Sequence, residues 1–320
     1  MIGTDPDGLR TQGPLGTWLR GCAMGAADIV PGVSGGTIAL ITGIYLRLLT
    51  ALGNIPGAAF DFLRTRRLGQ FFHQTDAGFL LALVVGVLTS VFSLAHLITY
   101  LLEHHEVLVW GFFFGLILGA IAHISRQIRT WRSLAPVMLV LGAFLAWGVS
   151  QLPPAALTLS APVAFGAGAL AISAMILPGV SGSFILVLLG LYAPVLAAIR
   201  SLDMGIMLFF GLGCIVGLLS VARLVATALR RHPSATLALL TGFMIGALHN
   251  VWPWRITVTS RTRSDGSELP VLQDNVLPFD YAQSTGEPHQ LASVLVLCIL
   301  GILFVLGIER VSRVRRPAPE

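Results

Sequence analysis

PGVSGG occupies residues 31–36, and PGVSGS recurs at residues 178–183, each time with apolar sequence on both sides. Proline lacks an N–H and disfavours helix in the residue before it, so an apolar helix must stop at Pro31 and again at Pro178. The glycines permit positive φ and close backbone approach, and the hydroxyl residues can cap a new helix. The repeated motif therefore predicts two apolar hairpins, each with a break at its centre.

The composition indicates an integral membrane protein. Of the 320 residues, 55% are hydrophobic and only 11% are charged, against about 25% charged in a soluble domain. All 20 basic residues are arginine, and the net charge of +5 is what loops facing an anionic membrane surface explain, so nucleic acid is not an expected partner. Cys22, Cys214 and Cys298 are spaced too widely for a metal motif, and no metal site is expected. Residues 1–13 are polar and lack a signal-peptide pattern, so we expect them to stay in the cytosol.

A helix needs about 20 apolar residues to span a bilayer. Six segments qualify: 78–102, 107–125, 134–151, 203–226, 235–252 and 290–309. The remaining regions, 14–52 and 161–199, each consist of two arms of about 15 residues, and such an arm is roughly 22 Å long as a helix. Each region is either a re-entrant hairpin or one long broken span. If both re-enter from a cytoplasmic N-terminus, most arginines lie inside, whereas full crossing puts the majority outside, so the re-entrant arrangement with both termini cytoplasmic is favoured.

The chain is also internally repeated. Residues 31–45 align with 178–192, with more than half of the positions identical, and GFFFG at 111–115 aligns with GFMIG at 242–246. A hairpin plus three crossings is an odd number of spans, so the second repeat must be upside down relative to the first. We therefore predict an all-α integral membrane fold of two inverted-topology repeats, each one re-entrant helical hairpin plus three transmembrane helices. The expected boundaries are 14–152 for repeat 1 and 161–309 for repeat 2, between the N-terminal segment 1–13 and a basic cytoplasmic tail at 310–320.

Hairpin tips that meet near mid-membrane suggest an anion site. The second arm of each hairpin would begin there, with unsatisfied N–H groups and the positive end of a helix dipole. Small residues packed between helices are the alternative reading, as for the glycines of the 111–119 GxxxG run. The candidate anion-binding residues are Gly32, Ser34, Gly35, Gly36, Thr37, Gly179, Ser181, Gly182, Ser183 and Arg223.

The runs MGAADIVPGVSGGTIALITGIY at 24–45 and ISAMILPGVSGSFILVLLGLY at 172–192 resemble the paired signatures of the polyprenyl-phosphate transporter family, formerly a membrane domain family of unknown function. The resemblance covers residues 15–310. It implies a flippase in the bacterial inner membrane that returns undecaprenyl phosphate, the lipid carrier of cell-wall synthesis, from the outer to the inner leaflet. The residues that match the signatures are Asp28, Pro31, Gly32, Ser34, Gly35, Gly36 and Thr37 in the first, and Pro178, Gly179, Ser181, Gly182 and Ser183 in the second. The chain departs where an acidic residue is expected after GIY, because it has Leu46 there and Ala193 after the second tyrosine.

The expected head group carries more negative charge than the two hairpins can neutralise. Two helix N-termini give about +1, whereas a phosphomonoester carries about −1.5 to −2. Arg223, which lies inside a predicted span, could add the missing charge or could snorkel to the interface. Asp28, one turn before the first break, could carry a coupling proton or sodium ion or could orient the loop through backbone bonds. No cofactor is expected.

These features favour a transporter without a covalent step, working by alternating access with the polyprenyl tail left in lipid. One alternative is an enzyme, a polyprenyl-diphosphate phosphatase, but Gly35 and Gly182 stand where such enzymes need an arginine beside the serine. Another alternative is an importer of a small soluble anion. A lateral opening toward lipid would favour the lipid substrate, and a closed aqueous vestibule the soluble one.

Overall fold

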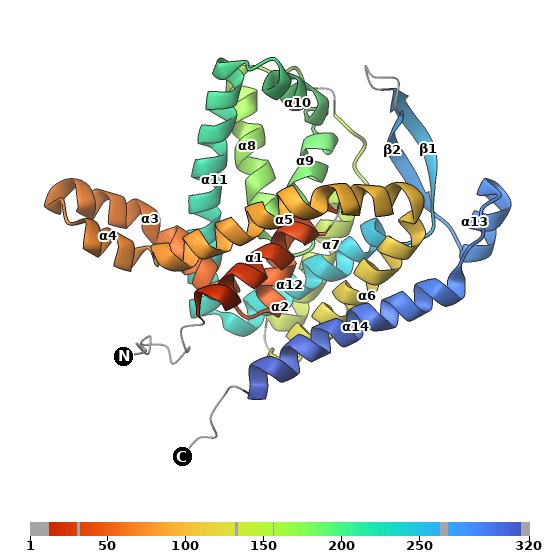
Figure 1. Cartoon of the computed structure of the whole chain (residues 1–320), viewed down its shortest axis with the longest axis horizontal. Helices are drawn as coiled ribbons and strands as arrows, with labels where there is room; N and C mark the ends of the chain where they lie inside the picture. Colours follow the sequence, from red (N-terminus) through yellow and green to blue (C-terminus); the bar gives the residue numbers. More distant parts are fainter. Residues whose placement is uncertain (1–12, 31–32, 132–133, 156, 263–267, 315–320) are drawn as a thin grey trace.

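The structure, a computed structural model, describes residues 13–30, 33–131, 134–155, 157–262 and 268–314 (Figure 1). Pro31 and Gly32, both candidate residues of the first break, lie outside the described residues. Among those that are described, helices dominate, and one short strand hairpin is present. The prediction of a helical, multi-pass membrane protein is confirmed.

A helix occupies each of the six expected spans. Among the described residues, five helices are long and apolar enough to cross a membrane, or up to seven if each of two bent helix pairs is counted as a span. Of the six, α7 is shorter, with 16 residues, and α12 reaches 19 residues only together with the 3₁₀ turn that follows it. The bounds are α5 Ala77–His104, α6 Glu106–Ser125, α7 Ala135–Ser150, α11 Met204–Arg231, α12 Pro233–Ala247 with the 3₁₀ turn η1 Leu248–Val251, and α14 Leu291–Val314.

The two hairpins differ from the expectation in their second arms. The first hairpin is α1 (Pro14–Ile29) with α2 (Gly35–Ile41), and the second is α8 (Ala161–Ile176) with α9 (Gly182–Leu188). The predicted length of about 15 residues was wrong for the second arms, because α2 and α9 have 7 residues each. The chain then bends by 119° into α3 (Tyr45–Thr65) and by 107° into α10 (Tyr192–Arg200).

Two glycines explain the second bends. Gly43 has φ +74° and Gly190 has φ +70°, in the left-handed region that only glycine adopts at little cost. Each follows directly on the short helix and ends it, as a left-handed residue commonly does. Each of these short helices therefore lies between a Pro-Gly motif and a glycine turn.

Helices from the two halves of the sequence pack in equivalent pairs. Helix α1 packs along α5 as α8 packs along α11, and α6 packs along α14 as α12 packs along α7. Glycines bring the backbones together at each seam: a Cβ on Gly115 would overlap the carbonyl oxygen of Cys298, and one on Gly246 that of Ala143. Small residues at helix crossings are how membrane helices approach closely in lipid. The GxxxG glycines are thus packing residues.

Gly213 and Gly211, on the same helix, allow a matched test of this packing. An added Cβ at Gly213 would overlap the Phe165 carbonyl oxygen of α8, whereas Gly211 has nothing within 4 Å of that position. We expect Gly213→Ala to lower the free energy of unfolding by about 1–3 kcal/mol, since overpacking moves backbone. Gly211→Ala should be neutral or slightly stabilising. Thermal denaturation in detergent measures both, and equal midpoints would contradict this packing.

The prediction that the fold is all-α was wrong outside the helical core. Strands β1 (Arg255–Thr262) and β2 (Glu268–Asn275) pair antiparallel and are followed by α13 (Pro278–Thr285). Indole groups join the two ends of this connection, because Trp254 Nε1 donates to the His289 carbonyl and Trp252 Nε1 to the Val276 carbonyl. Trp254 and Tyr281 also pack with Val107 of α6 and Val294 of α14, so these described parts of the connection cover one end of the bundle.

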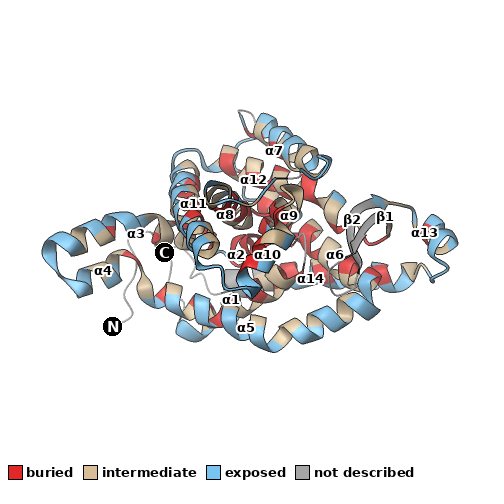
Figure 2. Ribbon diagram, turned by 90° about the horizontal axis from the view of Figure 1, so that it is seen from above, coloured by how far each residue is buried: buried red, intermediate tan, exposed pale blue. Residues whose placement is uncertain are grey.

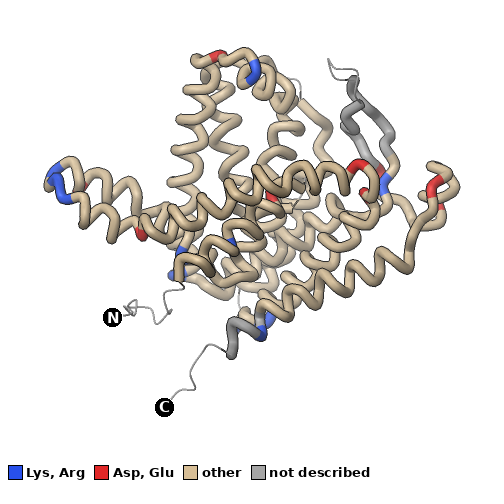
Figure 3. The backbone as a smooth tube through the Cα atoms, in the orientation of Figure 1, with Lys and Arg blue, Asp and Glu red and all other residues tan. Residues whose placement is uncertain are grey.

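The connection between α2 and α5 consists of two helices. Helix α3 runs on beyond the length of α10 and turns back into α4 (Leu68–Gln74), so that the two project from the bundle at the left of Figure 1. Basic residues gather where α3 meets α4 (Figure 3). At the base of the projection formed by α3 and α4, Arg47 makes a two-point ion pair with Asp76. Nε lies 2.6 Å from Oδ2, and Nη2 lies 3.1 Å from Oδ1. This pair fixes the projection to the start of α5.

The most deeply buried element is the short helix α2. All seven of its residues are buried, and Figure 2 shows buried residues gathered at the centre of the bundle while α4 and the projecting end of α3 are largely exposed. The first hairpin tip is thus enclosed by protein.

Candidate functional site

The first hairpin tip satisfies its own backbone. Ser34 caps α2, with its Oγ accepting from Gly36 N at 3.1 Å. Asp28 Oδ1 accepts from Gly35 N at 2.7 Å, so the carboxylate reaches from the last turn of α1 across the break. A Cβ on Gly35 would lie 2.6 Å from Asp28 Oδ2, so a larger residue there would push the carboxylate out of this position. From the sequence, we expected the backbone N–H groups at the start of α2 to be available to an anion. Those of Gly35 and Gly36 instead donate to side chains of the protein itself.

The two hairpin tips touch each other. Ser34 Oγ donates to the Met175 carbonyl at 2.7 Å, and Tyr45 Oη donates to the Ile176 carbonyl at 3.2 Å. In the opposite direction, Gly179 N donates to Thr37 Oγ1 at 3.2 Å. Side chains of the first tip therefore satisfy the carbonyls at the end of α8 and one N–H of the second loop. Groups unpaired by the breaks need such partners in a low-dielectric interior.

The second tip is more open than the first. Ser181, in the equivalent position to Ser34, makes no side-chain cap to α9. Its Oγ lies 2.8 Å from Ser183 Oγ, and Ser183 is exposed. Ser34 and Thr37, by contrast, are only 1% and 0% exposed. The structure thus brings most described candidates into one cluster, but it leaves the Ser181–Ser183 pair as its accessible hydroxyls.

Tyr45 belongs to this cluster although its role was not predicted. Removing its hydroxyl leaves the buried Ile176 carbonyl without that donor, and we expect Tyr45→Phe to lower the free energy of unfolding by about 1 kcal/mol. The repeat-related Tyr192 has no equivalent bond within the described part of the chain, so Tyr192→Phe is the matched control. Denaturation midpoints measured side by side check this, and a larger effect at Tyr192 would contradict it.

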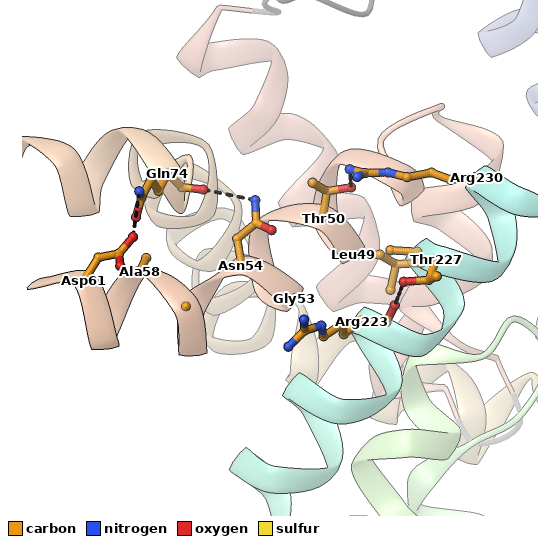
Figure 4. Close-up of a pocket in the computed structure, with 12 residues that line it drawn as sticks. Leu49, Thr50, Gly53, Asn54, Ala58, Asp61, Gln74, Arg223, Thr227 and Arg230 are labelled. Atoms are coloured by element: carbon orange, nitrogen blue, oxygen red, sulfur yellow. Dashed lines mark hydrogen bonds between the residues drawn. The ribbon is translucent and has the colours of Figure 1, made fainter.

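Arg223 does not join the tip cluster. It lies on α11 against α3, where a Cβ added to Gly53 would be 3.1 Å from Arg223 Cα. There it lines a cavity between α3, α4 and α11, and none of the described tip residues shares that lining (Figure 4). The sequence predicted that Arg223 lies within a span, but it did not show which cavity the side chain faces.

Comparison with known proteins places the chain in a family. Residues 24–269 match the VCA0040-like family, described as undecaprenyl phosphate translocase-like. The chain belongs to this family. A polyprenyl-phosphate transporter of Vibrio cholerae is 44% identical over 301 residues, covering 94% of this chain and 98% of the relative. A polyprenyl-phosphate transporter of Staphylococcus aureus is 34% identical over 253 residues, covering 73% and 85%. No solved structure matches the chain.

These findings confirm the resemblance drawn from the two Pro-Gly signatures. The family match covers both Pro-Gly motifs, from before Asp28 to beyond Ser183, and the Vibrio cholerae relative aligns over almost the whole of both chains. Both Pro-Gly motifs therefore lie within the region that matches the family.

Proposed function

We propose that the protein is a membrane transporter that moves polyprenyl phosphate, such as undecaprenyl phosphate, between the leaflets of the bacterial cell membrane. The observation that carries this is the direct contact of two broken hairpins, Ser34 with Met175 and Thr37 with Gly179, in a chain of this family. Irregular backbone at membrane depth occurs where it is buried in protein or lines a cavity. The names of both relatives support the substrate class.

In this proposal the two repeats are inverted relative to one another. The equivalent packing of α1 with α5 and of α8 with α11 supports a repeated plan, and three spans per repeat reverse the second copy. Alternating access about the joined tips would then carry the head group while the polyprenyl tail stays in lipid. The direction, from the outer to the inner leaflet, and the cytoplasmic termini are parts of the same proposal.

The phosphate meets the second tip in this proposal. The Ser181 and Ser183 hydroxyls are the accessible donors there, and the start of α9 adds the positive end of a helix dipole. Asp28 acts by orienting the first loop through Gly35. A coupling proton or sodium ion carried by the same carboxylate is the alternative.

A leaflet-exchange assay tests the site. The intact protein in vesicles should accelerate exchange of labelled polyprenyl phosphate, and replacing both Ser181 and Ser183 with alanine should slow it about tenfold, because two hydroxyl donors are removed. The double variant Ser150→Ala, Ser201→Ala is the control, because these hydroxyls donate to carbonyls of their own helices, away from the tips. Equal rates in all three proteins would contradict the site, and release of inorganic phosphate would support a phosphatase instead.

A further inference from the structure

A cavity of about 500 Å³ lies between α3, α4 and α11, apart from the hairpin tips (Figure 4). Its polar lining includes Thr50, Asn54 and Asp61 from α3, and Arg223, Thr227 and Arg230 from α11. On α11 these residues are spaced by four and three positions, which places them on one face of the helix. Two arginines about two turns apart therefore face the same space.

The arginines are available to a ligand. Arg230 Nη2 donates to Thr50 Oγ1 at 2.9 Å, and this leaves its other N–H groups uncommitted within the described residues. The guanidinium of Arg223 has no acceptor in the described part of the chain. The single carboxylate of the described lining, Asp61, accepts from Gln74 Nε2 at 3.2 Å instead of pairing with either arginine.

Glycines of α3 make room for an occupant. A Cβ on Gly57 would meet nothing within 4 Å, so the space beside it is open. At Gly53, one turn earlier, the backbones of α3 and α11 come close, and this closes one side of the cavity. Large apolar side chains are exposed on both helices, because Leu224 follows Arg223 in the sequence, Phe60 precedes Asp61, and each of the two is 68% exposed. A head group in the cavity would have hydrocarbon-compatible surface next to it for a tail.

We infer that this cavity is a binding site for a phosphate monoester, held by Arg223 and Arg230. Two arginines give +2 and Asp61 −1, a net charge of +1, which offsets half or more of the charge of about −1.5 to −2 that a phosphate monoester carries. Guanidinium groups suit phosphate because they donate two parallel hydrogen bonds. The inference rests on the proposed function for its ligand, the head group of polyprenyl phosphate, and it makes the cavity a second stopping place besides the tips.

Equilibrium binding to the full-length protein in nanodiscs tests this site. The probes are a polyprenyl phosphate and, separately, inorganic phosphate. We expect Arg223→Gln to weaken binding of the lipid about tenfold or more, since a charge-assisted contact is lost. Gly57→Leu should do the same by filling the cavity, from a position where an added Cβ meets nothing within 4 Å.

Two control variants match these changes. Arg231 neighbours Arg230 on α11 but does not line the cavity, and Gly78 has open space around a Cβ but lies in α5. Arg231→Gln and Gly78→Leu should bind like the intact protein. Weaker lipid binding in only the two cavity variants supports the site with the lipid head group as its ligand. Weaker binding of inorganic phosphate alone supports the site with a soluble anion as its ligand.

Equal lipid and phosphate affinities in all five proteins would overturn the inference. Failure of the proposed function looks different, because it appears in the exchange assay: the intact protein would not accelerate leaflet exchange even though the cavity variants still lose binding. That result would leave the cavity as a phosphate site in a protein of another activity.

Discussion

Gly36→Val is expected to abolish leaflet exchange and to lower the free energy of unfolding by about 3 kcal/mol, the upper end for overpacked cores. Any Cβ at Gly36 would overlap the carbonyl oxygen of Ile176, which belongs to the other hairpin. Because the obstacle is backbone and not a flexible side chain, the two tips must separate to accommodate the substitution. Denaturation in detergent and the exchange assay measure the two effects.

Gly148→Val is the control for this substitution. Gly148 lies within helix α7, with nothing within 4 Å of an added Cβ. Gly148→Val makes the same change in side chain and in helix propensity, but at a position away from the tips. A Gly36→Val protein that folds and exchanges lipid as well as the control would show that contact between the tips is not required.

Asp28→Ala is expected to lose both stability and transport, whereas Asp28→Asn retains most of both. Alanine removes the acceptor of the Gly35 N–H, and an unsatisfied group in the low-dielectric interior costs about 1–3 kcal/mol. Asparagine keeps a carbonyl oxygen in the same place. Denaturation midpoints and exchange rates of the two variants give the comparison.

The asparagine variant also separates the two roles of Asp28. If the carboxylate only orients the loop, exchange survives its neutralisation. A protein with Asp28→Asn that folds normally but no longer exchanges lipid, or no longer responds to an imposed proton or sodium gradient, would contradict the orienting role and assign the coupling ion to this residue.

Much of the fold followed from hydropathy and from two short motifs. The positions of the six apolar helices and of the two breaks were predictable because proline and glycine act locally, and because the bilayer sets the apolar length of a span. The second bends were not predicted, although Gly43 and Gly190 are repeated in the sequence. A glycine permits positive φ without requiring it, so only the tertiary structure shows that the chain turns there.

The sequence predicted which residues lie at the hairpin tips better than it predicted their hydrogen-bond partners. Ser34 and Thr37 were expected to offer hydroxyls to an anion, but they are committed to Met175 and Gly179 of the other hairpin. Such pairings join residues far apart in sequence and have no local pattern. The cavity could not be predicted from the sequence for the same reason, because in its lining Arg230 of repeat 2 donates to Thr50 of repeat 1.

The central claim is that the joined hairpins carry a lipid phosphate across the membrane. The most direct measurement compares, in vesicles containing the intact protein, the leaflet exchange of a labelled polyprenyl phosphate with that of the matching polyprenol, which lacks the phosphate. We expect the protein to accelerate exchange of the polyprenyl phosphate and to leave the slower rate of the polyprenol unchanged, with no inorganic phosphate released. Exchange of neither lipid, or equal acceleration of both, would contradict it.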